Sequence, residues 1–408
     1  MCSRCRSGTI RFTLHLCVTR DGERGLPHAA RVERNGRQAK PKEERCGAMR
    51  KLRDLVVCAR PQEAFGYFGW PTVARLGDGS LLVGASGLRR THICPWGRSV
   101  VCRSEDGGQS WGEPVVVNNT PLDDRDVGLV SLGGSRVALT WFTSNTRVLL
   151  AAHRDPGTGQ WDEATRRAGA VMDAWTPRMC EETIGSFVRV SEDGGEAWGE
   201  VRRAPVSSPH GFTVLRDGTW LYLGKRWLFE RRGLDTLHAH DTPILAAASS
   251  DEGRTWELRG TVPLPAGVGW GDCHEPHVLE LPDGALLGAL RVHCPFHSML
   301  TRSSDGGRTW SAPEMLAAGS PPHLLRHSSG AVVVTYGYRQ APFGQRARVS
   351  LDDGRTWGEE LTLRDDGVSG DLGYPSSVEL SDGSILTVYY QALPGGGNCA
   401  LLGTVWEL

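Results

Sequence analysis

The chain has 408 residues, with 46 Lys and Arg against 47 Asp and Glu and a formal net charge of -1. This balance excludes attraction to nucleic acid or to an anionic membrane through bulk charge. The sequence lacks an apolar run of the roughly 18 to 20 residues that a membrane helix needs, and its N-terminus lacks the charged start and apolar stretch of a secretory signal. We therefore expect a cytoplasmic protein that binds neither nucleic acid nor membrane.

Residues 1–50 differ from the rest of the chain, because they are basic and carry none of the repeats described below. We expect this segment to be disordered, or to result from a start codon placed too far upstream of Met49. Residues 51–408 then form a single domain, and Leu52 to Cys58 is its first predicted strand, completing the last repeat beside residues 400–408.

The eleven cysteines lack the paired spacing of a disulfide framework, so we expect reduced thiols. Cys2-x-x-Cys5 has the spacing of half a zinc site, but no second half follows at metal-binding spacing. We predict neither a metal nor a cofactor.

The pattern Ser-x-Asp-x-Gly-x-x-Trp, here called the box, occurs five times, starting at residues 104, 191, 249, 303 and 350. Such recurrence indicates one supersecondary unit used repeatedly. The step from 104 to 191 is the longest, and a degenerate copy at Asp155 to Trp161 predicts a further unit inside it. Within a box, Asp supplies a side-chain acceptor and Gly a positive φ, so we expect the boxes to serve the fold rather than chemistry.

A second repeat joins two apolar, β-rich runs through a turn of the Asp-Gly type, the strongest short-range signal of a hairpin. The turns end at six glycines: Gly79, Gly134, Gly218, Gly284, Gly330 and Gly383. Each unit therefore reads as four strands, and six such units close radially with only short exposed edges. The sequence predicts an all-β fold, a six-bladed β-propeller of four-stranded antiparallel blades.

The innermost strand of each blade begins at the central axis of a propeller, so residues at one fixed distance before the turns are expected to form a ring. Nine residues before the six glycines stand Trp70, Arg125, Pro209, Glu275, Pro321 and Tyr374. Ionisable neighbours add to this ring: Asp126, His210, His274 and His323. Polar groups gathered at strand starts predict an axial pocket.

From these residues the chain resembles the sialidase superfamily, whose six-bladed propellers carry the same boxes, over roughly residues 60–408. In that family a Glu opens a strand before an Asp-Gly turn and an Arg follows the second strand, as do Glu275 and Arg291 here. A further Arg precedes a late box, as Arg346 does. The family's nucleophilic Tyr opens the last inner strand in a Gly-Tyr-Ser-like sequence, which Tyr374 matches.

The resemblance implies an exo-acting, retaining hydrolase that removes a terminal acidic sugar from a glycan. Tyr374 is the implied nucleophile, Glu275 its base, and Arg291 and Arg346 the ligands of the sugar carboxylate. A sialic acid carries that carboxylate on its anomeric carbon, so a neutral phenol approaches it without the repulsion that a carboxylate nucleophile meets. Arginine suits the carboxylate because it pairs in bidentate fashion.

Two motifs of the family are missing. The family's Phe/Tyr-Arg-Ile-Pro is replaced by residues 68–71, Phe-Gly-Trp-Pro, so the first arginine is absent, and Arg125 or Arg90 is the candidate to replace it. The family's acid/base Asp precedes the first box, where residues 91–98 hold no carboxylate. The acid is then His92, Asp126 or Asp272, or else the mechanism differs. His has a suitable ordinary pKa, and an apolar pocket raises that of Asp.

The remaining candidates are side chains suited to binding a sugar. His210 and His274 lack metal-ligand spacing, so we expect hydrogen-bonding roles, and Trp70 is a candidate platform for a sugar ring. Two other functions stay open: a propeller that binds glycans without cleaving them, and an acidic-sugar lyase with Tyr374 or a His as its base.

Overall fold

The computed structural model describes residues 49–147, 163–226, 242–293 and 296–408. The chain divides into compact units at Met1–Cys46 and Gly47–Leu408. The predicted N-terminal extension, including Cys2 and Cys5, therefore falls outside the described residues, apart from its last two positions. The degenerate box at Asp155 to Trp161 also lies outside them.

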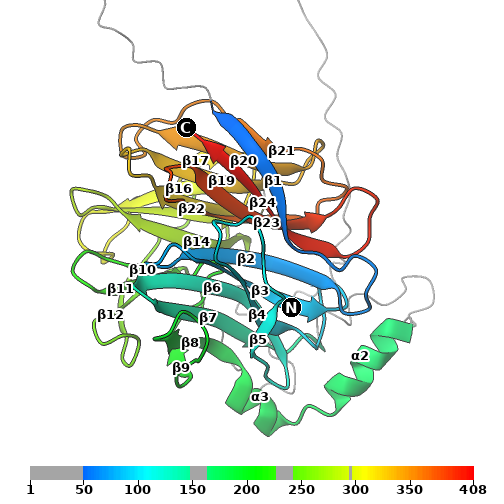
Figure 1. The fold of residues 1–408 in the computed structure, drawn as a ribbon. Coiled ribbons are helices and arrows are strands. Elements are labelled where there is room, and N and C mark those ends of the chain that lie inside the picture. The colour runs from blue at the N-terminus through cyan, green and yellow to red at the C-terminus, as the bar shows by residue number, and fades with distance from the viewer. Residues whose placement is uncertain (1–48, 148–162, 227–241, 294–295) are drawn as a thin grey trace, which may run out of the picture. The chain divides into compact units, whose positions relative to one another are not determined.

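The second unit consists of six four-stranded antiparallel sheets, which confirms the predicted propeller (Figure 1). Blade one is β2 (Tyr67–Arg75), β3 (Leu81–Arg89), β4 (Arg98–Ser104) and β5 (Val115–Asn118). Blade two is β6 (Asp123–Gly133), β7 (Arg136–Ser144), β8 (Gly185–Ser191) and β9 (Arg202–Ala204). Blade three is β10 (Thr213–Val214), β11 (Trp220–Gly224), β12 (Leu245–Ser249) and β13 (Glu257–Thr261).

The other three blades follow the same order. Blade four is β14 (Cys273–Glu280), β15 (Leu286–Val292), β16 (His297–Ser303) and β17 (Glu314–Ala317). Blade five is β18 (Pro322–Arg326), β19 (Val332–Tyr338), β20 (Gly344–Ser350) and β21 (Leu361–Arg364). Blade six is β22 (Leu372–Glu379), β23 (Ile385–Ala392), β24 (Cys399–Glu407) and β1 (Arg50–Cys58). A hydrophobic cluster lies at each junction between neighbouring blades.

The local turns form where the two repeats predict them. Gly79, Gly284 and Gly383 have φ values of 89°, 86° and 84°, the left-handed region that glycine adopts without strain. In the box that starts at Ser303, the Ser303 hydroxyl donates to Asp305 Oδ1 at 2.8 Å and accepts the N–H of Gly307 at 2.9 Å. The Ser and Asp of this box therefore bond within their own turn, which is a structural role.

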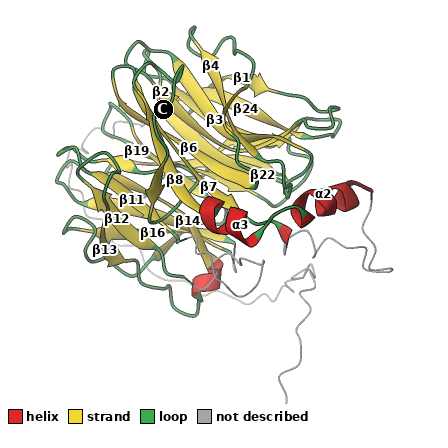
Figure 2. Ribbon diagram, turned by 90° about the horizontal axis from the view of Figure 1, so that it is seen from below, coloured by secondary structure: helices red, strands yellow, loops and turns green. Residues whose placement is uncertain are grey.

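The described part of the long step between the first two boxes contains no additional blade, so the additional unit predicted there is wrong. It contains one ordinary blade enlarged between β7 and β8 by α2 (Glu163–Asp173) and α3 (Pro177–Thr183) (Figure 2). Met172 and Trp175 of this insertion cluster with Ile93 and Trp96 of the loop after β3. None of the helices in the described ranges is long and apolar enough to cross a bilayer.

The sixth blade is closed by the other end of the chain, as the sequence predicts. Strand β1 pairs with β24 from Arg50 opposite Glu407 to Cys58 opposite Leu401, and it lies beside β24 in Figure 1. Val57 and Cys58 are buried in the cluster between blades six and one. This pairing joins the first and last described strands into one sheet.

We predict that a chain starting at residue 60, which lacks β1, melts about 10 °C or more below the full chain or fails to stay soluble. Each lost backbone hydrogen bond contributes about 1 kcal/mol, and the apolar face of β24 becomes exposed. Thermal unfolding followed by circular dichroism measures this. A chain starting at Gly47 is the control, and equal melting temperatures for all three chains would contradict the role of β1.

Candidate active site

Four inner strands share an unusual backbone conformation near their starts. Trp70, Asp126, Glu275 and Tyr374 have φ values of 55°, 52°, 48° and 51° on β2, β6, β14 and β22. Each lies at a shift in strand pairing with the second strand of its blade. A left-handed non-glycine residue costs on the order of 1 to 3 kcal/mol, and such residues cluster at functional sites.

The predicted ring agrees with three of these four positions. Trp70, Glu275 and Tyr374 occupy them as expected. In the second blade the position belongs to Asp126 and not to Arg125, because the β6–β7 hairpin contains an additional register shift between Ser131 and Gly133.

Tyr374, Glu275 and Arg291 form one hydrogen-bonded group that joins blades six and four. The Tyr374 hydroxyl donates to Glu275 Oε1. Arg291 Nη1 donates to Glu275 Oε2 at 2.8 Å and to the Tyr374 oxygen at 3.4 Å. Arg291 Nη2 lies 3.0 Å from His293 Nδ1. Glu275 and Arg291 of blade four therefore meet Tyr374 of blade six at one point.

The surrounding charges leave Glu275 ionised and Tyr374 protonated. Burial raises the pKa of Glu275, but Arg291, His274 and the Tyr374 hydroxyl outweigh it and lower that pKa to about 2. Burial and the nearby Glu275 carboxylate raise the pKa of Tyr374 well above its ordinary value. The resting pair is thus a neutral phenol hydrogen-bonded to a carboxylate, the arrangement in which the carboxylate can take the phenolic proton.

Asp126 is the second carboxyl group at these strand starts, and its surroundings shift its pKa in the opposite direction from that of Glu275. Burial raises its pKa to about 7, while Arg125 opposes the shift and the Glu275 carboxylate adds to it. Two neighbouring carboxyl groups with pKa values on opposite sides of the working pH are typical of acid/base sites.

Trp70 does not offer the sugar platform expected of it, because its side chain is 1% exposed. The guanidinium carbon of Arg125 lies 4.2 Å from the Trp70 ring centroid, and that of Arg89 lies at 4.9 Å. Arg89 also forms a fully buried ion pair of 2.6 Å with Asp123. Trp70 therefore holds arginines in place instead of stacking on substrate.

His92 contacts the edge of Trp70, with 4.9 Å between ring centroids, and is paired with a carboxylate that the sequence analysis missed. His92 Nδ1 lies 2.9 Å from Asp371 Oδ1. The hydroxyls of Tyr67 and Tyr390 donate to the same carboxylate at 3.0 Å and 3.1 Å. Asp371 comes from the segment just before β22, so it reaches the 91–98 loop only in the folded ring.

Arg346 is not brought to Tyr374 and Glu275, contrary to expectation. Its guanidinium donates to the carbonyls of Gln345, Arg364 and Pro342 at 3.0, 2.6 and 3.0 Å, all within blade five and its turns. These contacts use the side chain as a brace between β20, β21 and the preceding loop.

Arg339, which follows β19, lies where Arg346 was expected. Its guanidinium carbon is 5.8 Å from the Tyr374 ring centroid and 5.3 Å from that of Phe296. Its Nε donates to the Leu372 carbonyl at 3.0 Å, while Nη2 is buried without a hydrogen-bond partner among the described residues. A guanidinium with an unpartnered, buried N–H group is suited to bind an anion.

Three further candidates lie away from the Tyr374 group or are occupied otherwise. Arg90 stacks on Phe65 at 5.7 Å. His274 Nε2 lies 2.6 Å from the Gly271 carbonyl, and burial lowers the pKa of His274 to about 4. Asp272 ends the short helix η1 (Trp270–Asp272), and its carbonyl accepts the backbone N–H of His293 at 2.7 Å.

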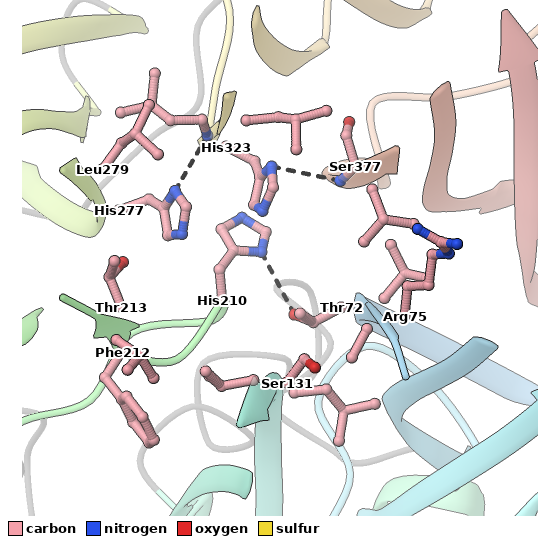
Figure 3. A pocket seen from close by; sticks show the side chains of 18 of the residues that line it. Thr72, Arg75, Ser131, His210, Phe212, Thr213, His277, Leu279, His323 and Ser377 are labelled. Carbon is pink, nitrogen blue, oxygen red and sulfur yellow. Dashed lines mark hydrogen bonds between the residues drawn. The ribbon is translucent and has the colours of Figure 1, made fainter. Parts of the chain in front are cut away.

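His210 lies in a separate axial cavity of about 490 Å³ lined by the inner strands of all six blades (Figure 3). It sits 5.7 Å from His277 and 4.9 Å from His323 between ring centroids. His277 and His323 each accept a backbone N–H at Nδ1, from Leu324 and Ser377. Their Nε2 atoms therefore carry the proton, which opposes metal coordination there. In the described ranges, no three His, Cys, Asp or Glu side chains are arranged to hold a metal ion.

One sequence signal could have found Arg339, which the sequence analysis missed. A basic residue stands within one position of the end of the second strand in blades one, three, four and five: Arg89, Lys225, Arg291 and Arg339. Reading this position across all blades would have selected Arg339 over Arg346. Asp371 carried no comparable repeat signal, since its partner His92 is on another blade.

Comparisons with known proteins agree with this fold. The family model described as a BNR repeat-like domain matches residues 169–387. The chain is 25% identical over 385 residues to a sialidase from Micromonospora viridifaciens, a match that covers 86% of this chain and 54% of the relative. The chain thus spans about half the length of that curated relative.

Among solved structures, a protein of unknown function from Dyadobacter fermentans aligns with a TM-score of 0.69 at 23% identity, covering 89% of this chain and all of that one. A sialidase from Streptococcus pneumoniae aligns at 0.62 and 15% identity, covering 87% and 70% of the two chains. An α-L-arabinofuranosidase from Fusarium graminearum aligns at 0.56 and 12%, covering 87% and 97%. At these identities the structural likeness supports the fold.

We predict that Asp126→Asn removes a pH dependence of stability. Between pH 4 and 7 folded Asp126 keeps a proton that the unfolded chain has lost, so the free energy of unfolding of the wild type falls as the pH rises through this window. The variant lacks this fall, and its advantage over the wild type should grow by on the order of 2 to 4 kcal/mol from pH 4.5 to 7.5. Urea unfolding at both pH values measures it, and parallel pH profiles would contradict the raised pKa.

Proposed function

Because the chain belongs to the family of BNR repeat-like domains, we propose that it is a glycoside hydrolase that removes a terminal acidic sugar from a glycan with retention of configuration. The observation that carries this proposal is the contact of Tyr374 with Glu275 and Arg291. It provides a nucleophile, a base and a cation within hydrogen-bonding distance of one another. The sialidase and arabinofuranosidase relatives support glycoside hydrolysis as the class of reaction.

Tyr374 attacks the anomeric carbon in the first step. Its O–C bond forms as the glycosidic C–O bond breaks, and Glu275 takes the phenolic proton across the hydrogen bond already present. In the second step water replaces the phenolic oxygen at the anomeric carbon, and Glu275 returns the proton to Tyr374. The two displacements together retain the anomeric configuration.

Arginines near Tyr374 support an acidic sugar as the substrate. Arg291 touches the Tyr374 oxygen, and Arg339 approaches the Tyr374 ring with a buried, unpartnered Nη2. A carboxylate bound here would supply the missing acceptor and offset the positive charge of Arg339. Arg291 and Arg339 thus take the role that the sequence analysis gave to Arg291 and Arg346.

We predict that Tyr374→Phe lowers kcat/KM at least about 10³-fold, because it removes the nucleophilic oxygen. The measurement is release of the sugar from a panel of fluorogenic glycosides of sialic, ketodeoxy and uronic acids. Tyr336→Phe is the matched control, since it also removes a buried hydroxyl bonded to a Glu, Glu360, but in blade five.

Each contrary outcome would exclude the proposed mechanism or indicate another function. Full activity of Tyr374→Phe would exclude the covalent mechanism. A product that absorbs in the near ultraviolet would indicate a lyase, and saturable binding without release by the wild type would indicate a glycan-binding propeller.

We also predict that Arg339→Gln raises KM for an acidic glycoside by about 10- to 100-fold, because it removes a charged donor to the carboxylate. Arg346→Gln should leave KM unchanged and lower the melting temperature, since it strips three carbonyls of their donor. Steady-state kinetics and melting curves of both variants decide between the two arginines. The reverse pattern would return the carboxylate to Arg346.

A further inference from the structure

The loop at residues 91–98 has no carboxylate of its own, but the fold supplies one from blade six. Asp371 accepts hydrogen bonds from His92, Tyr67 and Tyr390, so four side chains converge on one point. Because His92, Tyr67 and Tyr390 act as donors to the same carboxylate, they lower the pKa of Asp371 even though burial raises it. Asp371 is therefore ionised beside the imidazole.

This contact determines which nitrogen of His92 is free to act. Nδ1 is 2.9 Å from the Asp371 carboxylate and must carry a proton to donate to it. Nε2 is then the nitrogen left for a substrate. The His92 side chain is 43% exposed, whereas Asp126 is buried beside Glu275. A leaving group that departs toward solvent therefore meets His92 and not Asp126.

The cluster also accounts for the arginine missing at position 69. A Cβ placed on Gly69 would lie 3.3 Å from Tyr67 Cε1 and 3.7 Å from Tyr390 Cδ2. The two tyrosines that hold Asp371 thus occupy the space beside Gly69 that a larger side chain would need. The two departures from the sialidase pattern, at Gly69 and at His92, belong to one cluster.

We propose that His92, oriented by Asp371, is the acid/base residue that protonates the departing aglycone and then activates water. This inference rests on the proposed glycosidase function and names the residue that completes it. Asp371 is a positioning residue that holds the imidazole and stabilises its protonated form. His92 and Tyr374 both lie beside Trp70, with ring centroids 4.9 Å and 6.4 Å from it.

His92 gives up one proton and takes up one proton in each catalytic cycle. As the glycosidic C–O bond breaks, the His92 imidazolium gives its Nε2 proton to the aglycone oxygen, which leaves as a neutral alcohol. Neutral His92 then takes a proton from the water whose oxygen displaces Tyr374 from the anomeric carbon. The imidazolium is restored, and no other reactant is needed.

The charges around His92 set the direction of its pH dependence. Burial lowers the pKa of His92, Asp371 raises it, and Arg125 and Arg89 lower it. Activity that needs the imidazolium is lost as the pH rises through the pKa of His92. Removing the Asp371 charge therefore moves this loss of activity to lower pH.

The test compares two glycosides of one acidic sugar, one with a 4-nitrophenol aglycone and one with methanol. Nitrophenolate leaves without a proton, whereas methoxide does not. His92→Asn should lower kcat/KM about 10²- to 10⁴-fold on the methyl glycoside and less than about tenfold on the nitrophenyl glycoside. Asp371→Asn should move the alkaline limb of the pH profile to lower pH by about one unit.

His327→Asn serves as the matched control. His327 Nε2 lies 3.6 Å from Glu379, so it too pairs with a carboxylate, but beside the turn that ends at Gly330. It should change neither the aglycone dependence nor the pH profile. Melting curves of all variants show whether each is folded, and His92→Gln replaces His92→Asn if that variant is not.

Each other outcome overturns the inference. Equal losses on both glycosides, or an unmoved alkaline limb in Asp371→Asn, exclude His92 as the acid while leaving the glycosidase function intact. Aglycone dependence in Asp126→Asn in place of His92→Asn assigns the role to Asp126. If the wild type releases no sugar from any acidic glycoside, the proposed function fails and this inference fails with it.

Discussion

The pairing of β1 with β24 is the constraint on which the rest of the molecule depends. It makes one sheet from the first and last described strands and so holds blade six against blade one. The site residues lie at the starts of strands from different blades, and Tyr374 reaches Glu275 only across the ring. An O–H···O hydrogen bond spans only about 2.5 to 3.0 Å between its oxygens, so a small opening of the ring would separate Tyr374 from Glu275. Closure of the fold and assembly of the site are therefore the same event.

Within the closed ring, backbone strain and buried charge are concentrated at the same strand starts. Trp70, Asp126, Glu275 and Tyr374 adopt left-handed conformations that only strong surrounding packing sustains. Arg291 compensates the buried Glu275 and brings its pKa to about 2, whereas Asp126 has weaker compensation and a pKa of about 7. Two carboxyl groups of similar ordinary pKa thus acquire different pKa values from their positions in the fold. A pair of this kind can act as acid and base.

The two departures from the sialidase pattern, at Gly69 and in the 91–98 loop, are compensated by residues from other blades. Arg125 stacks on Trp70 near the position where the first arginine is missing. Asp371 brings a carboxylate to the loop that lacks one, and Arg339 approaches Tyr374 where Arg346 does not. Side chains from different points of the chain converge on the same region because every inner strand begins at the axis. A substitution at one blade is therefore open to compensation from its neighbours.

The sequence by itself determined the six blades, the hairpin turns and the closing strand, because these depend on local turn chemistry repeated at regular spacing. Through its resemblance to the sialidases, the sequence also singled out Glu275, Arg291 and Tyr374, which meet in the fold. It overcounted units between the first two boxes, since a helical insertion and a blade both lengthen the chain there. Only the tertiary structure decided that Asp126 and not Arg125 occupies the second strand start, because one register shift in the β6–β7 hairpin turns alternate side chains to opposite faces. It also decided the partner of His92, because Asp371 precedes the last blade and His92 follows a strand of the first, and no local pattern records which side chains meet when the ring closes.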